Sequence, residues 1–402
     1  MRFSRSLLLA ALPIAFLVAS CSQPADTQAP DLAPQFGTPG YDQANAVVND
    51  PQRGHVYVAG ISAANLDRER GTVYLRRYSL NGTLAWKRLI QVATVIDDPN
   101  VHVAGRVEGM RVDASGNVYV GWSRQVYDWY NREAFLLKFN SSGRLLSERS
   151  VGIHLADFEV DGVGNLYLAV GNFGDHPYGA HERYYLRKYD AKGRLVWERS
   201  RTYDSEGQLE NPAQAIPAPY DIGLASDGSL YVAGSNANTC CTQEGGAELS
   251  KYSNAGVTLW EKPGAGVVAV AGRNFYLLSG ANLRKFDPNG VLRWQKTLTG
   301  FVAHTGSLAV DASLNLYVAG EASSRDSSYD LFVRKYTPAG AVSWTYAPRL
   351  TTQEAALGVS AKGSGDVYLA GFTYGKVNGV NSGASDSFLL RLNSQGQKVW
   401  SR

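Results

Sequence analysis

Cysteine and histidine pairs are the side chains of this sequence best suited to chemistry. Cys240 and Cys241 are adjacent, and in an oxidising compartment such thiols tend to pair, here in a strained ring. His176 and His181 have acidic neighbours, but their spacing matches no established zinc pattern, so we predict no metal site. The sequence also lacks a nucleophile elbow, a phosphate-binding P-loop and a dinucleotide fingerprint. We therefore predict no catalytic residue and no cofactor, and favour a binding protein over an enzyme.

Aromatic residues gather in three segments that lie between predicted strands. Flat apolar rings beside polar groups suit the faces of sugars and peptides, so these segments are candidate ligand-binding loops. The alternative is that the rings pack within their own loops. The candidates are Trp122, Tyr127, Trp129 and Tyr130 in the first segment, Phe173, His176, Tyr178 and His181 in the second, and Phe372 and Tyr374 in the third.

A repeat of fixed spacing indicates which elements position these loops. Seven times, a cation precedes an aromatic or aliphatic residue that is followed four residues later by glycine, and tryptophan comes four residues after the glycine in all copies except the one with Ser147. An offset kept this often indicates stacked copies of one supersecondary unit. We interpret the cations as solvated strand positions. They are Arg77, Lys138, Lys188, Lys251, Lys285, Lys335 and Arg391, and the tryptophans are Trp86, Trp197, Trp260, Trp294, Trp344 and Trp400.

Each copy is predicted to form four antiparallel strands. A β-branched and aromatic run such as VYVAG around Tyr57 follows a turn rich in Asp, Gly and Asn, and the cation and tryptophan segments form a second hairpin. The aspartates of turns such as 113–117 lack the further carboxylates of a calcium loop, so they are assigned to the hairpins. Four strands per copy are typical of a propeller blade, which predicts an all-β, seven-bladed β-propeller. The fifth copy, with few residues between Gly280 and Phe286, is expected to be thin or irregular.

These residues resemble a known repeat family. The pattern VDASGNVYV followed by AFLLKFNSSGRLL is similar to the bacterial seven-bladed propeller repeats often labelled SBBP, and the resemblance covers residues 40–402. It implies an exported propeller and leaves the activity open. The glycine and tryptophan half also resembles the docking motif of pyrroloquinoline quinone propellers, which implies that the indoles pack between blades. Quinone-dependent alcohol dehydrogenases carry an adjacent-cysteine ring beneath their cofactor, but their calcium site and catalytic carboxylate do not map onto this chain.

The N-terminal residues resemble an export signal. Arg2 and Arg5 precede an apolar run in residues 1–20 that is too short for a membrane span, and the junction before Cys21 resembles a lipoprotein lipobox. Cys21 is therefore the predicted lipidation site, residues 21–39 a tether and residues 40–402 the propeller. A plain secretory signal is the alternative. Removing residues 1–20 lowers the formal charge from +3 by two arginines, and no basic stripe predicts nucleic-acid binding.

The predicted topology places the long connectors on one face of the ring. We expect a monomeric, lipid-anchored protein of the cell envelope that binds a protein or glycan through this face and touches the membrane only through its anchor. One alternative is a quinone-dependent oxidoreductase or a hydrolase with its site over the central channel. A structural spacer is another. Because the chain stops two residues after Trp400, residues 34–37 are expected to supply the missing strand end next to it.

Overall fold

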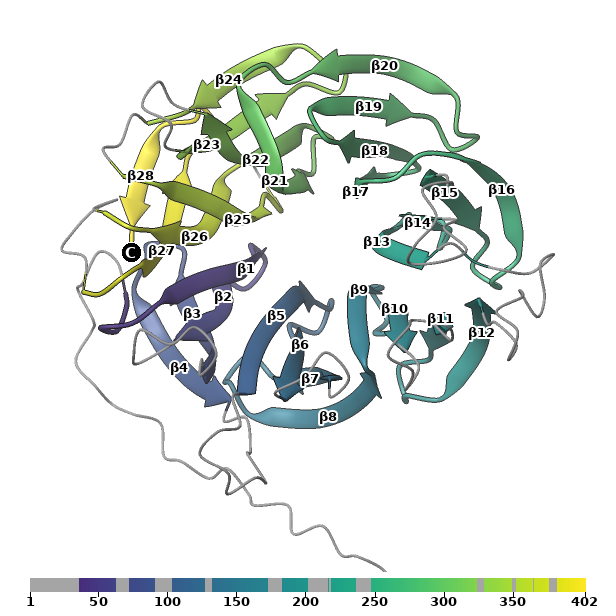
Figure 1. Ribbon diagram of the computed structural model, residues 1–402, viewed down its shortest axis with the longest axis horizontal. Coiled ribbons are helices and arrows are strands. Elements are labelled where there is room, and N and C mark those ends of the chain that lie inside the picture. Colours follow the sequence, from purple (N-terminus) through teal and green to yellow (C-terminus); the bar gives the residue numbers. More distant parts are fainter. Residues whose placement is uncertain are drawn as a thin grey trace, which may run out of the picture.

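The protein is a closed ring of β-sheets. The computed structural model describes residues 36–62, 72–90, 103–126, 132–172, 183–201, 216, 218–235, 247–323, 329–348, 352–363, 365–375 and 382–402. In this part of the chain, 28 strands form seven antiparallel sheets of four strands, with no helix. The sheets surround a central channel as blades (Figure 1), which confirms the predicted all-β, seven-bladed propeller.

Each blade takes four consecutive strands, from the innermost to the outermost. Blades 1 to 4 consist of β1 (Asp42–Asp50), β2 (His55–Ser62), β3 (Thr72–Ser79) and β4 (Leu84–Ile90); β5 (Val103–Val112), β6 (Val118–Val126), β7 (Arg132–Phe139) and β8 (Leu145–Gly152); β9 (His154–Val160), β10 (Leu166–Asn172), β11 (Arg183–Tyr189) and β12 (Leu195–Arg201); and β13 (Ala218–Leu224), β14 (Leu230–Ser235), β15 (Ala247–Tyr252) and β16 (Thr258–Pro263). Blades 5 to 7 consist of β17 (Val267–Ala271), β18 (Asn274–Ser279), β19 (Asn282–Phe286) and β20 (Leu292–Thr297); β21 (Phe301–Val310), β22 (Leu316–Ser323), β23 (Tyr329–Tyr336) and β24 (Val342–Tyr346); and β25 (Glu354–Ser360), β26 (Val367–Thr373), β27 (Asp386–Leu392) and β28 (Lys398–Ser401).

Aspartates close the hairpins on one face of the ring, which we call the tight-turn face. The Oδ1 atoms of Asp113, Asp161 and Asp311 accept hydrogen bonds from the backbone amides four residues later, at 2.8 to 2.9 Å. Because these carboxylates satisfy the turn's own amides, the aspartates serve the hairpins, as the sequence predicts.

A bulge in the innermost strand recurs in most blades. The register between the first two strands shifts at Asn45 in β1, Glu108 in β5, and at corresponding positions in four further blades. The glycine that ends the VYVAG run faces the bulge, and a Cβ atom at Gly60 would lie 2.0 Å from the carbonyl oxygen of Gln43. Glycine is therefore required there because the bulge brings the two backbones together.

Blade 5 is irregular, as predicted, but it is not thin. It contains all four strands, and its two inner strands pair without a register shift. Ser279 stands where blades 1, 4, 6 and 7 have the glycine that faces the bulge. Blade 5 is thus complete, and its irregularity lies in the missing bulge and the short connection between β18 and β19.

The N-terminal segment closes the ring. Phe36 and Ser387 exchange backbone hydrogen bonds of 3.1 and 3.0 Å. Two residues further along the same strand, Leu389 exchanges backbone hydrogen bonds with Arg402. The Phe36 ring packs edge-on against Tyr74, with the Arg76 guanidinium 3.9 Å from its centroid. Phe36 therefore extends the outermost strand of blade 7, as expected for residues 34–37, of which 34 and 35 lie outside the described residues.

Six tryptophans join neighbouring blades at the outer rim. Each indole N–H donates a hydrogen bond of 2.9 to 3.3 Å to a carbonyl in the outer turn of the next blade, and each indole packs against a buried tyrosine with centroids 5.7 to 6.5 Å apart. The interpretation of the tryptophans as inter-blade packing residues agrees with these contacts. The indole and acceptor pairs are Trp86 and Ser141, Trp197 and Asn254, Trp260 and Pro288, Trp294 and Pro338, Trp344 and Ser394, and Trp400 and Leu80.

The interpretation of the seven repeated cations as solvated positions is wrong. Five of them donate to the same carbonyl that accepts the indole hydrogen bond, at 2.6 to 3.3 Å, as Lys251 does with Pro288. Lys138 and Lys335 instead lie 3.7 Å from Asp113 and Asp311. In five junctions the cation and the tryptophan thus bind the same carbonyl oxygen of the next blade, which explains why the spacing between them is constant.

Candidate functional site

Connectors of variable length leave the ring on one face, which we call the long-loop face. Here the chain passes from the second strand to the third and from the fourth strand to the next blade. Only Ile153 separates β8 from β9, whereas residues 202–217 separate β12 from β13. On the tight-turn face no connection between the strands exceeds six residues. Sequence variation in length is therefore concentrated on a single face of a rigid scaffold.

Most of the predicted site residues lie outside the described part of the chain. These are Cys21, Tyr127, Trp129, Tyr130, Phe173, His176, Tyr178, His181, Cys240 and Cys241, and their assigned roles stay predictions.

Three of the predicted aromatic residues are described. Trp122 is buried, stacks on Phe135 with centroids 5.0 Å apart and belongs to the core between blades 1 and 2. Phe372 is also buried and packs edge-on against Tyr374, with centroids 5.5 Å apart, at the end of β26. The contacts of Trp122 and Phe372 match the alternative in which the rings pack within the protein.

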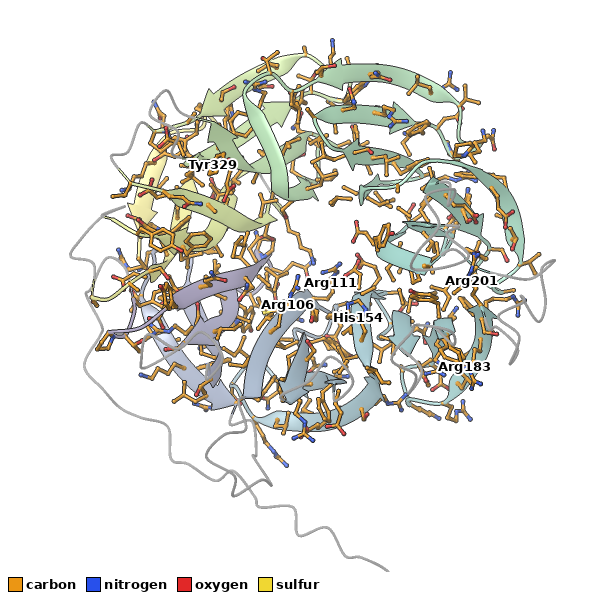
Figure 2. All side chains as sticks on the ribbon, in the orientation of Figure 1. Arg106, Arg111, His154, Arg183, Arg201 and Tyr329 are labelled. Atoms are coloured by element: carbon orange, nitrogen blue, oxygen red, sulfur yellow. The ribbon has the colours of Figure 1, made fainter. Side chains whose placement is uncertain are left out.

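The central channel contains charged residues that the sequence analysis did not single out. A cavity of about 600 Å³ is lined by the innermost strands of the ring. We call Arg111, Asp157, Glu159, Asp221 and Lys362 the channel charge cluster. Figure 2 shows Arg111 beside the opening of the ring. The wall also includes apolar residues such as Val270 and Leu357, but polar atoms make up most of its exposed surface.

The channel charge cluster connects the inner strands of blades 2 to 5. Arg111 donates from Nη2 to Asp157 Oδ1 at 3.1 Å, and its Nε lies 3.0 Å from Glu159 Oε1. Asp157 Oδ2 accepts a hydrogen bond from the amide of Ile222 at 3.2 Å, and Asp221 Oδ2 accepts one from the amide of Val268 at 2.5 Å. Each aspartate therefore satisfies an amide on the exposed edge of the next blade's inner strand.

Burial and like charge set the protonation of this cluster. Burial, followed by the charge and the hydrogen bond of Asp157, raises the pKa of Asp221 well above the usual range for aspartate. These effects favour the protonated form of Asp221. Burial also raises the pKa of Glu159, although the Arg111 cation opposes this shift. For Arg111 itself, burial disfavours the cation, but Glu159 and Asp157 outweigh it and raise the pKa.

Lys362 lies beyond the end of β25 at the tight-turn end of the channel. Its side chain lines the channel and is enclosed by the surrounding blades. This enclosure removes water from the ammonium group and lowers the pKa of Lys362, whereas the negative charge of Glu159 raises it. The cluster thus combines two basic side chains, Arg111 and Lys362, with three carboxyl groups.

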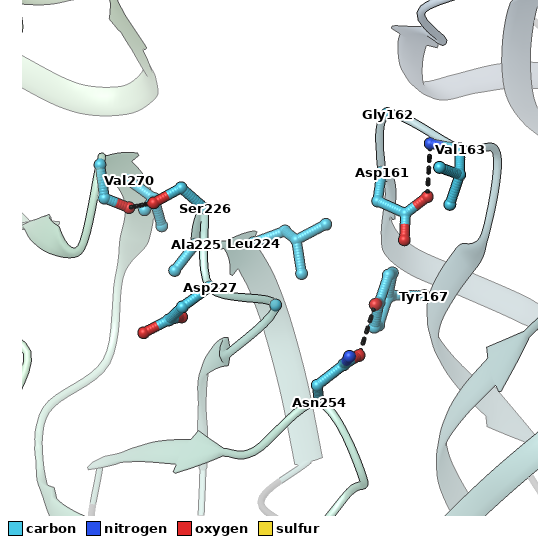
Figure 3. A pocket seen from close by; sticks show the side chains of 12 residues that line it. Asp161, Gly162, Val163, Tyr167, Leu224, Ala225, Ser226, Asp227, Asn254 and Val270 are labelled. Carbon is cyan, nitrogen blue, oxygen red and sulfur yellow. Dashed lines mark hydrogen bonds between the residues drawn. The ribbon is translucent and has the colours of Figure 1, made fainter.

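A second hollow lies on the tight-turn face between blades 3 and 4. It has a volume of about 580 Å³, and Figure 3 shows the turns that carry Asp161 and Asp227 on its two sides. Tyr167 donates to Asn254 at 3.0 Å, and Asp161 Oδ1 accepts from the amide of Val163 at 3.1 Å. Because these polar groups already form hydrogen bonds within a turn and between the two blades, this hollow is less suited to bind a ligand than the channel.

The described residues contain no group of three or more His, Cys, Asp or Glu side chains placed to hold a metal ion. Among these same residues, no helical segment has the length and hydrophobicity of a bilayer span.

Comparison with known proteins identifies the fold alone. No family model and no curated protein sequence matches the chain. The propeller domain of the trilobed protease from Pyrococcus furiosus is similar in structure, with a TM-score of 0.50 and 9% identity over 89% of this chain and 97% of that chain. Sqt1 from Chaetomium thermophilum has a TM-score of 0.50 and 10% identity, over 91% of this chain and all of that one. At such identities the shared property is the propeller architecture.

One sequence signal for the channel was available. Innermost strands are the least regular part of the repeat, and in blades 2 to 4 they carry charges within otherwise apolar runs, as in RVEGMRV and HLADFEV. The position of Asp157 corresponds to Gly109 in blade 2 and Asp221 in blade 4. Charged residues that vary between copies at one strand position indicate a local function better than the invariant residues do.

Proposed function

We propose that this chain is an exported, lipid-anchored binding module of the cell envelope, which recognises a protein or glycan partner through the long-loop face. The observation that carries the proposal is the division between the two faces. One face is closed by turns of at most six residues, several of whose carboxylates accept hydrogen bonds from backbone amides, and the other carries connectors of one to sixteen residues. Such an arrangement combines a rigid support with adaptable recognition loops.

The ring supplies the rigidity that this function needs. Six indole hydrogen bonds fix the blades to one another, and Phe36 closes the ring at blade 7. A preformed scaffold lowers the entropy lost on binding. The resemblance to exported SBBP-type repeats and the lipobox-like sequence before Cys21 support an envelope location.

The position at which the N-terminal segment joins the ring indicates which face of the propeller lies toward the tether. Phe36 pairs beside Ser387, near the start of β27, and that strand begins at the long-loop face. The preceding tether would therefore join the ring on the same side as the recognition loops. A partner close to the anchoring membrane fits this placement best.

Binding is tested with the mature protein on a glycan array and by crosslinking to purified envelope components. Replacing residues 127–130 with a Gly-Ser segment should reduce partner affinity at least about tenfold, which corresponds to loss of roughly 1.4 kcal/mol of binding free energy. The control replaces Ser313 and Leu314 in the turn on the opposite face. Equal loss in both variants, or no binding to any envelope protein or glycan, would contradict the proposal.

Lipid anchoring is tested separately. Metabolic labelling with a radioactive fatty acid should label the wild-type protein and not Cys21→Ala, which should also appear in the soluble fraction. An unlabelled wild-type protein would remove the anchor from the proposal and leave the recognition face untouched.

A further inference from the structure

The outer rim lacks an indole at one of its blade junctions, the junction between blades 2 and 3. There β8 lies on the rim (Figure 1), and it has the exposed Ser147 where the other outermost strands have tryptophan. We call this place, formed by Tyr119, Lys138, Arg149 and the turn 190–194 of blade 3, the open junction. The other six junctions show which group it accommodates, because they are copies of the same structural unit.

The turn that supports the indole elsewhere is uncovered in the open junction. A Cβ atom at Gly143, Gly256 or Gly396 would lie 2.6 to 3.0 Å from an indole of the preceding blade. At Gly193, a Cβ atom would meet only the Arg149 guanidinium within 4 Å among the described residues, with Nη2 at 2.7 Å. The surface on which the indoles rest is therefore present here without its indole.

Arg149 does not take the place of the missing indole. Its Nη2 donates to the carbonyl of Gly193 at 2.6 Å. In blade 1, Arg88 makes the corresponding contact with Gly143 at 3.0 Å, and its guanidinium lies 5.3 Å from the ring centroid of Trp86. An arginine at this position is thus compatible with an indole beside it, and Arg149 would give such a ring a cation–π contact.

Two groups of the open junction lack contacts that their counterparts have. The carbonyl of Ala191 stands where the carbonyls of the other blades accept an indole N–H, and no described residue donates to it. Lys138 and Lys335 both lie 3.7 Å from a turn aspartate, but the Lys138 side chain is 25% exposed and the Lys335 side chain, beside Trp344, is 11% exposed. An indole in the open junction would donate to Ala191 and cover Lys138.

We propose that the open junction binds the tryptophan side chain of a protein partner, flanked in that partner by acidic residues. The indole N–H would donate to the Ala191 carbonyl, and the ring would lie against Tyr119 and Arg149. A tryptophan held in this way is a common anchor of protein interfaces. The turn 190–194 belongs to the tight-turn face, so this site is separate from the long-loop face and independent of the function proposed above.

The charges around the open junction favour acidic flanks. Arg149 and Lys192 form no ion pair with a described residue, and Lys192 is exposed. Asp190 in the same turn is already paired with Arg194, whose Nε lies 2.7 Å from Oδ2. Glu148 alternates with Ser147 along β8, so its side chain belongs to the opposite face of the strand. The uncompensated charge beside the site is therefore positive, which complements carboxylates in a partner.

The test uses saturation-transfer difference NMR on the full chain with two peptides that differ in one side chain, acetyl-Glu-Trp-Glu-amide and acetyl-Glu-Leu-Glu-amide. We expect the tryptophan peptide to bind with a dissociation constant on the order of 1 mM or below, and the leucine peptide at least about tenfold more weakly. Acetyl-Lys-Trp-Lys-amide should bind at least about threefold more weakly, because its charges oppose those of Arg149 and Lys192.

Absence of binding by the acidic tryptophan peptide at about 10 mM, or equal binding by the leucine peptide, would overturn the proposal. Equal binding by the lysine peptide would overturn its claim of acidic flanks.

Ser147→Trp supplies the indole from the protein itself. It should weaken the tryptophan peptide at least about tenfold, because the open junction is then occupied. Ser150→Trp is the matched control and should bind as the wild type does, since its side chain points to the opposite face of β8. Unchanged binding in Ser147→Trp, or equal loss in both variants, would contradict the proposal. The wild-type peptide measurements hold even if a variant fails to fold, and replacing residues 127–130 on the long-loop face should leave this binding unchanged.

Discussion

The outer rim and the channel of this ring are built from the same seven copies but follow different rules. At the rim, the same indole contact recurs in six junctions, and only Ser147 interrupts it. In the channel, charges occupy the inner strands of blades 2 to 4, and the cluster includes only Lys362 from the other blades. Residues that repeat therefore maintain the architecture, and residues that differ between copies are those free to serve a ligand.

Carboxyl groups show the same division. At the rim, hydrogen bonds from the backbone amides of Arg194 and Val291 lower the pKa values of Asp190 and Asp287. In the channel, burial raises the pKa values of Asp221 and Glu159. The turn aspartates thus stabilise the fold as anions, whereas Asp221 fits the folded ring best when it is protonated.

The largest effect is expected from removing a rim indole. Trp260→Ala loses the packing against Tyr231 and Phe275 and the hydrogen bond to Pro288, so the free energy of unfolding should fall by about 3 kcal/mol. Denaturant titration followed by circular dichroism measures this loss. A loss below about 1 kcal/mol would show that the rim contacts do not hold the blades together.

A pair of glycine variants isolates the docking contact. A Cβ atom at Gly256 would lie 2.7 Å from the Trp197 ring, and the backbone φ there is +77°. Gly54 has a similar φ of +69°, but a Cβ atom there would meet nothing within 4 Å. Gly54→Ala should therefore cost about 1 kcal/mol from backbone strain alone, and Gly256→Ala about 2 kcal/mol more because of overpacking. Equal losses in denaturant titrations would mean that the indole contact is not tight.

The channel should make stability depend on pH. Because the pKa of Asp221 is raised in the folded protein, its contribution is fully present below the unfolded pKa of about 3.9 and is lost as pH rises through the folded pKa. Asp221→Asn should flatten the decline of unfolding free energy with pH, and Glu159, Asp42 and Glu354 should preserve part of it because their pKa values are also raised. Parallel curves for variant and wild type would contradict the raised pKa of Asp221.

The smallest effect is expected from repairing the interrupted junction. Ser147 pairs with Lys138 in the register that pairs Trp86 with Arg77, and the Arg149 guanidinium lies 4.4 Å from the Tyr189 ring centroid at this junction. Ser147→Trp should stabilise the ring by about 0.5 to 1 kcal/mol by adding the seventh indole contact. Ser150→Trp, exposed on the same strand, is the control and should change stability by less than about 0.5 kcal/mol in thermal unfolding.

The sequence predicted the architecture because the architecture depends on repeated residues. Lys251 and Trp260 both donate to the carbonyl of Pro288 in the next blade, so their spacing in the sequence is fixed by this shared contact. Corresponding contacts fix the same spacing in other copies. The role of the cations was nevertheless predicted incorrectly, because alternation along a strand does not show that a neighbouring blade covers the side chain.

The channel was not predicted because its residues meet only in three dimensions. Arg111, Asp157 and Asp221 belong to different copies, and no local pattern relates them. The bulge that shifts the register of the inner strands also changes which side chains face the axis, and the glycine that ends the VYVAG run and faces the bulge in blades 1, 4, 6 and 7 was not recognised as its marker. The aromatic candidates on the long-loop face remain predictions apart from Trp122, Phe372 and Tyr374.

The division between rim and channel is tested most directly by measuring two properties on the same two variants. The unfolding free energy and its slope with pH are determined for Trp260→Ala and Asp221→Asn. The account predicts that the rim variant loses about 3 kcal/mol of stability and keeps the wild-type slope, while the channel variant keeps its stability near pH 7 within about 1 kcal/mol and has a flatter slope. A large loss of stability together with a flatter slope in both variants would contradict it.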